Sequence, residues 1–202
     1  MALRTFTTLK LMGFMPESIL DIGANKGDWT RNVRGIFPEA NFLMVEANAK
    51  HNRTWQDMLV PPGSRVRGAF AVLDSQPKDV QWFMAGTGST GDSIFREKSW
   101  HQFTAHTRRA ETLDGLVART PLEGAARNFG LVKLDVQSAE LRLLAGGSRV
   151  LATAEVVAME VPFAGQCNAG APSFADYIRV MDEYGFAVFD MPEVRIPNNV
   201  VR

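Results

Sequence analysis

Three acidic residues each stand at the end of a short apolar run, where a buried parallel strand would finish. Glu46 closes the run Asn41–Glu46, Asp135 lies near the end of 131–136, and Glu160 follows Val156–Met159. A carboxylate can accept paired hydrogen bonds from sugar hydroxyls, and it can also take a proton from a reacting hydroxyl. Because the carboxyl ends of parallel strands meet at one rim, these acids predict a polar ligand site there.

A glycine turn precedes the first of these acids. The apolar run 18–21 ends at Asp21, Gly23 and Gly27 follow, and apolar residues then recur at helical spacing over 29–37. Strand, glycine turn and helix are the usual opening of a doubly wound α/β fold. Glycine tolerates positive φ and lets a ligand approach the backbone, but a tight strand–helix turn without a ligand would have the same composition.

The spacing in this turn favours one class of ligand. A dinucleotide fold would show G-x-G-x-x-G, whereas this chain has Gly23-x-x-x-Gly27 with Asp28 at the helix start. A carboxylate there would repel a pyrophosphate and suits a cationic group, such as the ammonium of S-adenosylmethionine. Glu46 lies 23 residues after Gly23, near the distance at which an acid binds ribose hydroxyls. The alternative for Glu46 is a charged strand end that faces water.

These segments resemble one enzyme family. The stretch DIGANKGDWT at 21–30 and VEAN at 45–48 resemble the opening of the FkbM family of S-adenosylmethionine-dependent methyltransferases. So do GTGS at 86–89, SIFRE at 93–97, TLD at 112–114 and VKLDVQSAEL at 132–141. The resemblance runs from about Pro16 to Asp190. It departs from the family pattern at Ser138, where glycine is usual, and at Phe95, where tyrosine is frequent.

The resemblance implies a fold, a cofactor and a set of site residues. The fold would be that of a class I methyltransferase, with a Rossmann-like, doubly wound and mostly parallel sheet in a single domain, 1–202. The cofactor would be S-adenosyl-L-methionine, and the methyl acceptor a hydroxyl of a sugar or natural product. Asp135 is the first candidate for the general base, followed by Glu160 and His101. The cofactor-binding residues would be Asp21, Gly23, Ala24, Asn25, Gly27, Glu46, Ala47, Ala71, Val72 and Asp135.

Residues 85–106 are expected to form a loop that closes over the acceptor. This segment is rich in glycine and in hydroxyl side chains and poor in large apolar residues over 85–93. A loop of that length in a compact domain is usually a lid or a binding loop. His101 and His106 lie toward its end, and an unperturbed pKa of about 6.5 would suit a base. The alternative is that both are ordinary surface or packing histidines.

The remaining pattern predicts an embellished and incomplete sheet. Residues 79–84 alternate as an extra antiparallel strand, Ser173 and Asp176 form a capping box that starts a helix, and 186–189 read as a sixth strand. The family resemblance implies a sheet of seven strands. However, the last residues of this chain include Pro192 and Pro197, which have no backbone N–H to donate to a strand ladder. The sequence therefore predicts a gap beside the fifth strand.

Composition bears on partners and compartment. Lys+Arg and Asp+Glu both count 22, so the net charge is zero and no nucleic-acid or membrane partner is predicted. Cys167 is the only cysteine, which excludes a disulfide within the chain and leaves a structural zinc without its usual thiolates. No signal-peptide pattern is present, so a cytoplasmic location is expected. The expected partner is a small-molecule acceptor, and a homo-oligomer is compatible with this reading.

The predicted reaction is methyl transfer from S-adenosylmethionine to a hydroxyl oxygen. The protein would hold acceptor, methyl and sulfur in line, and a carboxylate or histidine would take the acceptor's proton. Asp135 and Glu160 alone supply too few oxygens for a divalent metal, so no metal is predicted. Two alternatives remain: an NAD-dependent oxidoreductase on the same fold, and a protein that binds S-adenosylmethionine without turnover.

Overall fold

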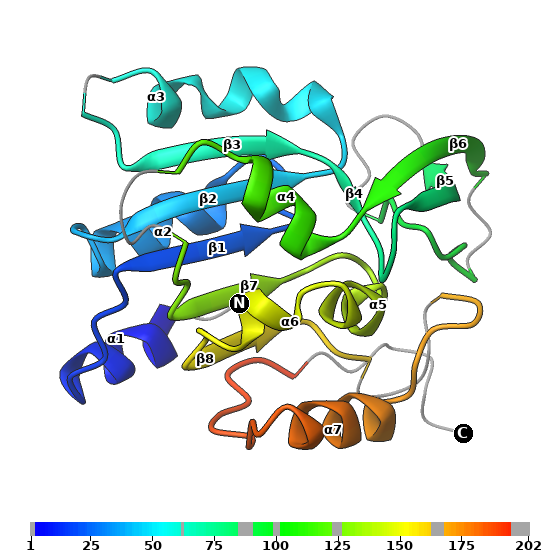
Figure 1. Cartoon of the computed structure of the whole chain (residues 1–202). Coiled ribbons are helices and arrows are strands. Elements are labelled where there is room, and N and C mark those ends of the chain that lie inside the picture. The colour runs from blue at the N-terminus through cyan, green and yellow to red at the C-terminus, as the bar shows by residue number, and fades with distance from the viewer. Residues whose placement is uncertain are drawn as a thin grey trace.

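Five parallel strands form the central sheet, in the order β3-β2-β1-β7-β8 (Figure 1). The computed structural model describes residues 3–61, 63–84, 91–98, 102–122, 127–162 and 168–194. The five strands are β1 (Ser18–Ile22), β2 (Asn41–Glu46), β3 (Val66–Phe70), β7 (Leu131–Leu134) and β8 (Val156–Met159). The chain winds outward from β1 in one direction and then from β7 in the other. This arrangement confirms the predicted Rossmann-like, doubly wound fold.

The central strands are apolar because helices cover both of their faces. Every residue of β1 and of β7 is buried. The register sets Asp21 of β1 opposite Met44 of β2 on one side and opposite Lys133 of β7 on the other. Two charged residues are therefore brought side by side in the middle of the sheet, under the turn that follows β1.

Two apolar layers hold the helices against the sheet. On one face, α1 (Leu3–Leu11), α2 (Asp28–Ile36), the 3-10 helix η1 (Ala49–Trp55) and α3 (Gln56–Leu59) pack on Ile19, Phe42 and Met44. On the other face, α4 (Leu113–Arg119), α5 (Glu140–Ala145) and α6 (Ser148–Leu151) pack on Leu20, Leu43 and Val132. The sandwich leaves the carboxyl ends of the strands as the rim on which loops gather.

A second, three-stranded sheet extends from this rim, in the order β4-β6-β5. It consists of β4 (Val72–Leu73), β5 (Lys78–Met84) and β6 (Thr104–Glu111). β5 is antiparallel to β6, which confirms the predicted extra antiparallel strand. β6 starts inside the segment 85–106, so His106 belongs to a strand and not to the expected loop.

Asp74 fastens this small sheet to the main body. Asp74 is fully buried. Arg142 of α5 donates hydrogen bonds to both of its carboxylate oxygens, at 3.0 and 2.6 Å, and the Lys78 ammonium lies 3.3 Å from the carboxylate. Burial alone would raise the pKa of Asp74, but the backbone N–H of Ser75 and the two cations outweigh it and leave that pKa lowered. The Asp74 carboxylate is thus held ionised as a link between β4 and α5.

The last helix, α7 (Phe174–Glu183), begins as predicted. The Ser173 hydroxyl accepts a hydrogen bond from the Asp176 N–H, and the Asp176 carboxylate accepts one from the Ser173 N–H, which completes the capping box. Tyr177 is its buried anchor. Ile178 and Tyr184 are exposed.

The run 131–136, expected as a parallel strand, is a strand only as far as Leu134, and α5 begins at Glu140. Between them Gln137 and Ser138 adopt positive φ angles of 55° and 78°, which neither a strand nor a helix can contain. A turn therefore separates β7 from α5.

The predicted sixth strand at 186–189 is wrong. These residues are irregular, and Val188 and Phe189 are 62% and 61% exposed. A strand needs a neighbouring ladder, and local apolar composition does not supply one. Within the part of the chain that the structure describes, β8 pairs only with β7 and no strand follows it. Residues 195–202 lie outside the described ranges, so the predicted gap beside β8 stays a prediction for them. Of the helices described, none is long and apolar enough to cross a bilayer.

Candidate functional site

The candidate site lies at the carboxyl ends of β1 and β7, where the winding of the sheet reverses. In open α/β sheets ligands bind at this switch point, in the crevice between the two diverging connections. Here the turn 23–27 and the turn 135–139 leave neighbouring strands, and the Asp135 N–H donates to the Ile22 carbonyl at 3.1 Å. The next strands on either side end in Glu46 and Glu160. The structure thus brings the predicted acids to one rim.

Packing requires the first glycine of this turn, and a left-handed backbone favours the second. Gly23 has φ of 75°, and a Cβ on it would lie 1.8 Å from the Asp135 carbonyl oxygen. Gly27 has φ of 85°, and a Cβ there would lie 2.6 Å from the Met58 methyl group. A tight strand–helix turn therefore accounts for both residues without any ligand. The case for a ligand has to come from the polar groups around the turn.

Glu46 and Asn25 supply those polar groups. One Glu46 carboxylate oxygen accepts from the Asn25 N–H at 2.8 Å, and the other accepts from the Asn48 N–H at 2.9 Å. Asn25 has positive φ, 47°, and its carbonyl accepts from the Trp55 indole N–H at 2.8 Å. Among the described residues its side-chain oxygen Oδ1 is buried without a partner. An unpaired buried acceptor is costly, so this turn fits a ligand that brings donors.

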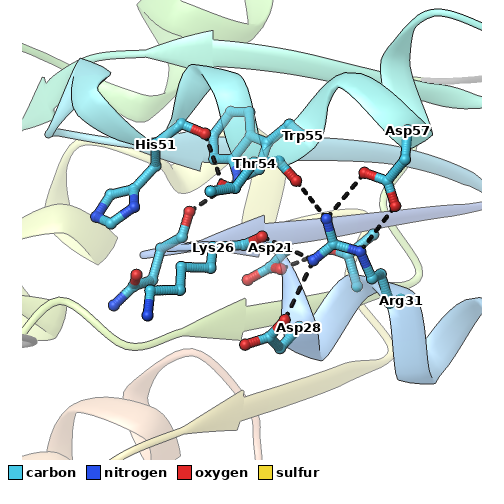
Figure 2. A network of polar contacts seen from close by, with 10 residues as sticks. Asp21, Lys26, Asp28, Arg31, His51, Thr54, Trp55 and Asp57 are labelled. Carbon is cyan, nitrogen blue, oxygen red and sulfur yellow. Dashed lines mark hydrogen bonds and ion pairs between the residues drawn. The ribbon is translucent and has the colours of Figure 1, made fainter.

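Arg31 braces the turn from the side of the helices, as Figure 2 shows. It donates to both carboxylate oxygens of Asp57, at 3.0 and 2.9 Å, to the Lys26 carbonyl at 2.8 Å and to the Thr54 carbonyl. It also lies 3.1 Å from the Asp28 carboxylate. Arg31 therefore faces two carboxylates, Asp28 and Asp57, and offsets only part of the Asp28 charge.

A buried ion pair supports the turn from beneath. Lys133 lies 3.0 Å from the Asp21 carboxylate and donates to the Gly23 carbonyl at 2.9 Å, while Thr30 donates to Asp21 at 2.6 Å. Burial lowers the pKa of Lys133, but the carboxylates of Asp21 and Asp135 outweigh burial and leave that pKa raised. Asp21 is fully buried, so its side chain acts on the predicted cofactor site by holding Lys133 under the Gly23 turn.

Asp135 stands at the same point but faces outward. Its side chain is 37% exposed and lies 3.6 Å from Lys133. The side-chain amide of Gln137 donates to Asp135 at 3.1 Å and to Glu160, also at 3.1 Å. Two of the predicted catalytic acids are therefore linked through one amide. The third candidate, His101, lies outside the described residues, as do 85–90 of the predicted lid.

The other predicted cofactor residues gather around Glu46. The Ala71 N–H donates to the Glu46 carbonyl at 3.0 Å, and Val72 is buried with Ala47 packed against its cluster. His51 is buried, and Glu46 lies close enough to influence its pKa. Burial lowers the pKa of His51, and Lys50 and Lys26 lower it further, while Glu46 acts in the opposite direction. His51 is therefore a neutral imidazole at neutral pH, close to the predicted ribose site.

Sequence reasoning missed three residues that fix the turn after β7. The Gln137 carbonyl accepts from the Ser93 hydroxyl at 2.8 Å and from the Asn168 amide at 2.7 Å. Both donors are buried, and they come from segments far apart in the chain. Ser93 and Gln137 stand in segments that carry the family resemblance, but no local pattern indicates that Asn168 reaches them.

A cavity in the structure lies away from this rim, and the rim shows no cluster of metal-binding side chains among the described residues. A cavity of about 280 Å³ is lined by Asn41, Arg65, Arg67, Phe129 and their neighbours, at the starts of β2 and β3 and thus at the opposite end of the strands. In the described ranges, no three His, Cys, Asp or Glu side chains come together as a metal site would require.

Comparison with known proteins gives a few similar solved structures. No family model and no curated protein matches the sequence. The structure is similar to the methyltransferase FkbM from Methylobacillus flagellatus KT, with a TM-score of 0.48 and 15% identity. It is also similar to the pyocyanin biosynthetic protein PhzM, with a TM-score of 0.43 and 14% identity. The alignments cover 77% and 92% of this chain but only 37% and 49% of those proteins. Similarity this low does not assign the chain to the family of either protein.

Proposed function

We propose that this protein is an S-adenosylmethionine-dependent O-methyltransferase that acts on a hydroxyl of a sugar or natural product. The observation that carries the proposal is the rim at the switch point. The Glu46 carboxylate and the unpaired Asn25 oxygen flank the first turn, and the outward-facing Asp135 follows the neighbouring strand. The resemblance of the same segments to the FkbM family supports the choice of cofactor and of reaction.

The polar groups of the first turn fit the cofactor. Each oxygen of Glu46 receives one backbone N–H and keeps a second acceptor position, so a ribose hydroxyl pair can donate to it. The unpaired Asn25 oxygen would accept from an ammonium group. Ala47, Ala71 and Val72 supply an apolar edge beside Glu46 for an aromatic base.

The protein's own part in the reaction is positioning and proton removal. S-adenosylmethionine, when bound, supplies an electrophilic methyl group. Asp135 accepts the hydrogen bond of the acceptor hydroxyl and takes its proton as the oxygen becomes nucleophilic. Lys133 steadies Asp135 from below at 3.6 Å, and Glu160 provides a second acceptor for a neighbouring hydroxyl. Holding the reacting groups in line supplies most of the rate advantage.

Two measurements test the proposal against its alternatives. Calorimetric titration with S-adenosylmethionine and, separately, with NAD distinguishes a methyltransferase from an oxidoreductase on the same fold. Incubation with a panel of glycans and hydroxylated metabolites, followed by mass spectrometry, detects the gain of one methyl group. We expect binding of S-adenosylmethionine, none of NAD, and methylation of at least one polyhydroxylated acceptor. Binding of NAD alone would overturn the proposal, and cofactor binding with no methylated product would favour a protein that binds without turnover.

A further inference from the structure

The turn after β7 is strained in a way that points to function. Among the described residues, only Asn25, Gln137 and Ser138 combine a side chain with positive φ. For residues other than glycine this conformation costs free energy, and it persists where the surrounding structure enforces it, typically at active sites. Asn25 belongs to the predicted cofactor turn. Gln137 and Ser138 form the turn beside Asp135, so the strain is concentrated at the rim.

The backbone of Gln137 is held from two sides. Its carbonyl accepts hydrogen bonds from Ser93, at 2.8 Å, and from Asn168, at 2.7 Å. Ser93 pairs with Phe83 at the end of β5, and Asn168 pairs with Glu97. Both donors are almost completely buried. The position of Gln137 is thus set by segments outside its own turn, which is how the strain is maintained.

The side chain of Gln137 makes use of that fixed position. A glutamine amide has two N–H donors, and here Nε2 donates to Asp135 Oδ1 and to Glu160 Oε2, at 3.1 Å each. The other oxygen of Asp135, Oδ2, lies 3.6 Å from Lys133. One cation and one amide therefore orient Asp135 through different oxygens. Two carboxylates that would otherwise repel each other are held together by a neutral donor.

We propose that Gln137 is a positioning residue, whose amide holds Asp135 and Glu160 in one orientation toward the acceptor hydroxyl. This inference rests on the proposed methyl transfer and adds to it the group that aligns the base. Because Gln137 reaches the acceptor only through the two carboxylates, its loss should affect turnover and not cofactor binding. A misalignment of about 1 Å at a reacting group can cost about 10²-fold in rate.

The neighbouring residue offers a matched control. Gln137→Gly removes the amide and relieves the positive φ, and Ser138→Gly relieves the positive φ at the next position while leaving the amide in place. Both variants should unfold at or above the wild-type temperature and bind S-adenosylmethionine with wild-type affinity. We expect kcat to fall about 10²-fold in Gln137→Gly and to stay at the wild-type value in Ser138→Gly. Wild-type kcat in Gln137→Gly, or a lower unfolding temperature that accounts for the loss, would overturn the proposal.

A second measurement does not depend on activity. The side-chain amide signals of Gln137 in a nitrogen–proton NMR spectrum are identified as the pair missing from Gln137→Gly. They should shift in Asp135→Asn and again in Glu160→Gln, because each carboxylate accepts one of the two protons. The amide of Gln81, which donates to Thr107 on the small sheet at 3.2 Å, should shift in neither. If the Gln137 signals fail to shift in one or both of these variants, the hydrogen-bond bridge from Gln137 to Asp135 and Glu160 is refuted. Shifts in both, in a protein that methylates nothing, would leave the bridge intact and refute the proposed function instead.

Discussion

At the scale of single residues, the acids of the rim differ in what holds them. Glu46 is held by two backbone N–H groups, one from the glycine turn and one from Asn48. Asp135 is held by side chains alone, a buried lysine and an amide. Backbone donors fix the Glu46 carboxylate in one place, which suits binding. The Asp135 carboxylate is 37% exposed and held by side chains, so it can contact a substrate.

Glu46→Gln should weaken cofactor binding with little effect on the fold. An amide keeps one acceptor oxygen but replaces the other by a donor, so it loses one contact to the turn and one to a ribose hydroxyl. The loss of a hydrogen bond to a charged group costs about 1.5–3 kcal/mol, or roughly 10- to 100-fold in affinity. Calorimetry with S-adenosylmethionine measures this, with Glu39→Gln as the control, since Glu39 is exposed and pairs with Arg65 at the surface. Equal affinity in the two variants would falsify the ribose assignment.

Asp135→Asn should reduce turnover and leave stability near that of the wild type. Lys133 keeps its nearer partner, Asp21, at 3.0 Å, so the buried ammonium remains neutralised when Asp135 loses its charge. Loss of a general base typically costs about 10²–10⁴-fold in rate. The unfolding temperature, the cofactor affinity and kcat are measured on one preparation. A clearly destabilised variant that still turns over would show that Asp135 serves Lys133 and would move the search for the base to Glu160 and His101.

At the scale of elements, one buried acid ties the strained turn to the last helix. Glu140, the first residue of α5, is fully buried. Its Oε1 accepts from the Val136 N–H at 2.9 Å and its Oε2 from the Tyr177 hydroxyl of α7 at 2.6 Å. Burial raises the pKa of Glu140, and the hydrogen bond from Tyr177 offsets this only in part. The link between α5 and α7 therefore carries a dependence on pH.

The sign of that dependence follows from linkage. A pKa for Glu140 above its ordinary value of 4.5 means that the folded state binds this proton more tightly than the unfolded chain. The contribution of Glu140 to the free energy of unfolding is then fully present below pH 4.5 and declines as the pH rises through the folded-state pKa. Glu140→Gln cannot titrate, so its stability relative to the wild type should increase as the pH rises from 4.5. Denaturant unfolding of both proteins across this range tests the prediction, and a relative gain by the wild type would contradict it.

At the scale of the whole molecule, helices cover both faces of the central sheet. Among the described residues, the edge formed by β8 has no neighbouring strand. The N–H groups of Val156 and Glu160 donate to Gly130 and Leu134 of the neighbouring chain segment, at 2.9 and 3.2 Å. Because successive N–H groups of a strand point to opposite sides, those of Val157 and Met159 point away from β7. In the part of the chain that the structure describes, no strand lies on that side. An apolar edge of this kind is a place where another strand can add.

Hydrogen exchange at this edge should show the alternation. In dilute protein we expect the amides of Val157 and Met159 to exchange faster than those of Val156 and Ala158, since only the latter pair with β7. If copies of the chain associate through this edge, the difference should shrink as the protein concentration rises. Equal protection of all four amides at the lowest concentration would mean that the chain covers its own edge, contrary to the gap expected from Pro192 and Pro197.

The sequence by itself determined what depends on local pattern. Continuous apolar runs that end in acids predicted the parallel strands and the rim on which Glu46, Asp135 and Glu160 meet. Alternation predicted the antiparallel strand β5, and the spacing of Ser173 and Asp176 predicted the capping box. Each of these follows from the period of the backbone or from hydrogen bonds made within a few residues. The cofactor was inferred from the spacing of the glycine turn together with the family resemblance, and the acceptor from the resemblance alone.

Only the tertiary structure decided what depends on partners far away in the sequence. Gly23 is required because a Cβ there would meet the Asp135 carbonyl, and Arg31 pairs with both Asp28 and Asp57. The same holds for Gln137, because the residues that fix it, Ser93, Asn168 and Glu160, come from three other segments. Residues 186–189 have the composition of a strand but no ladder to join. The composition of a segment determines which hydrogen bonds it can make, but only the fold determines which partners are close enough to make them.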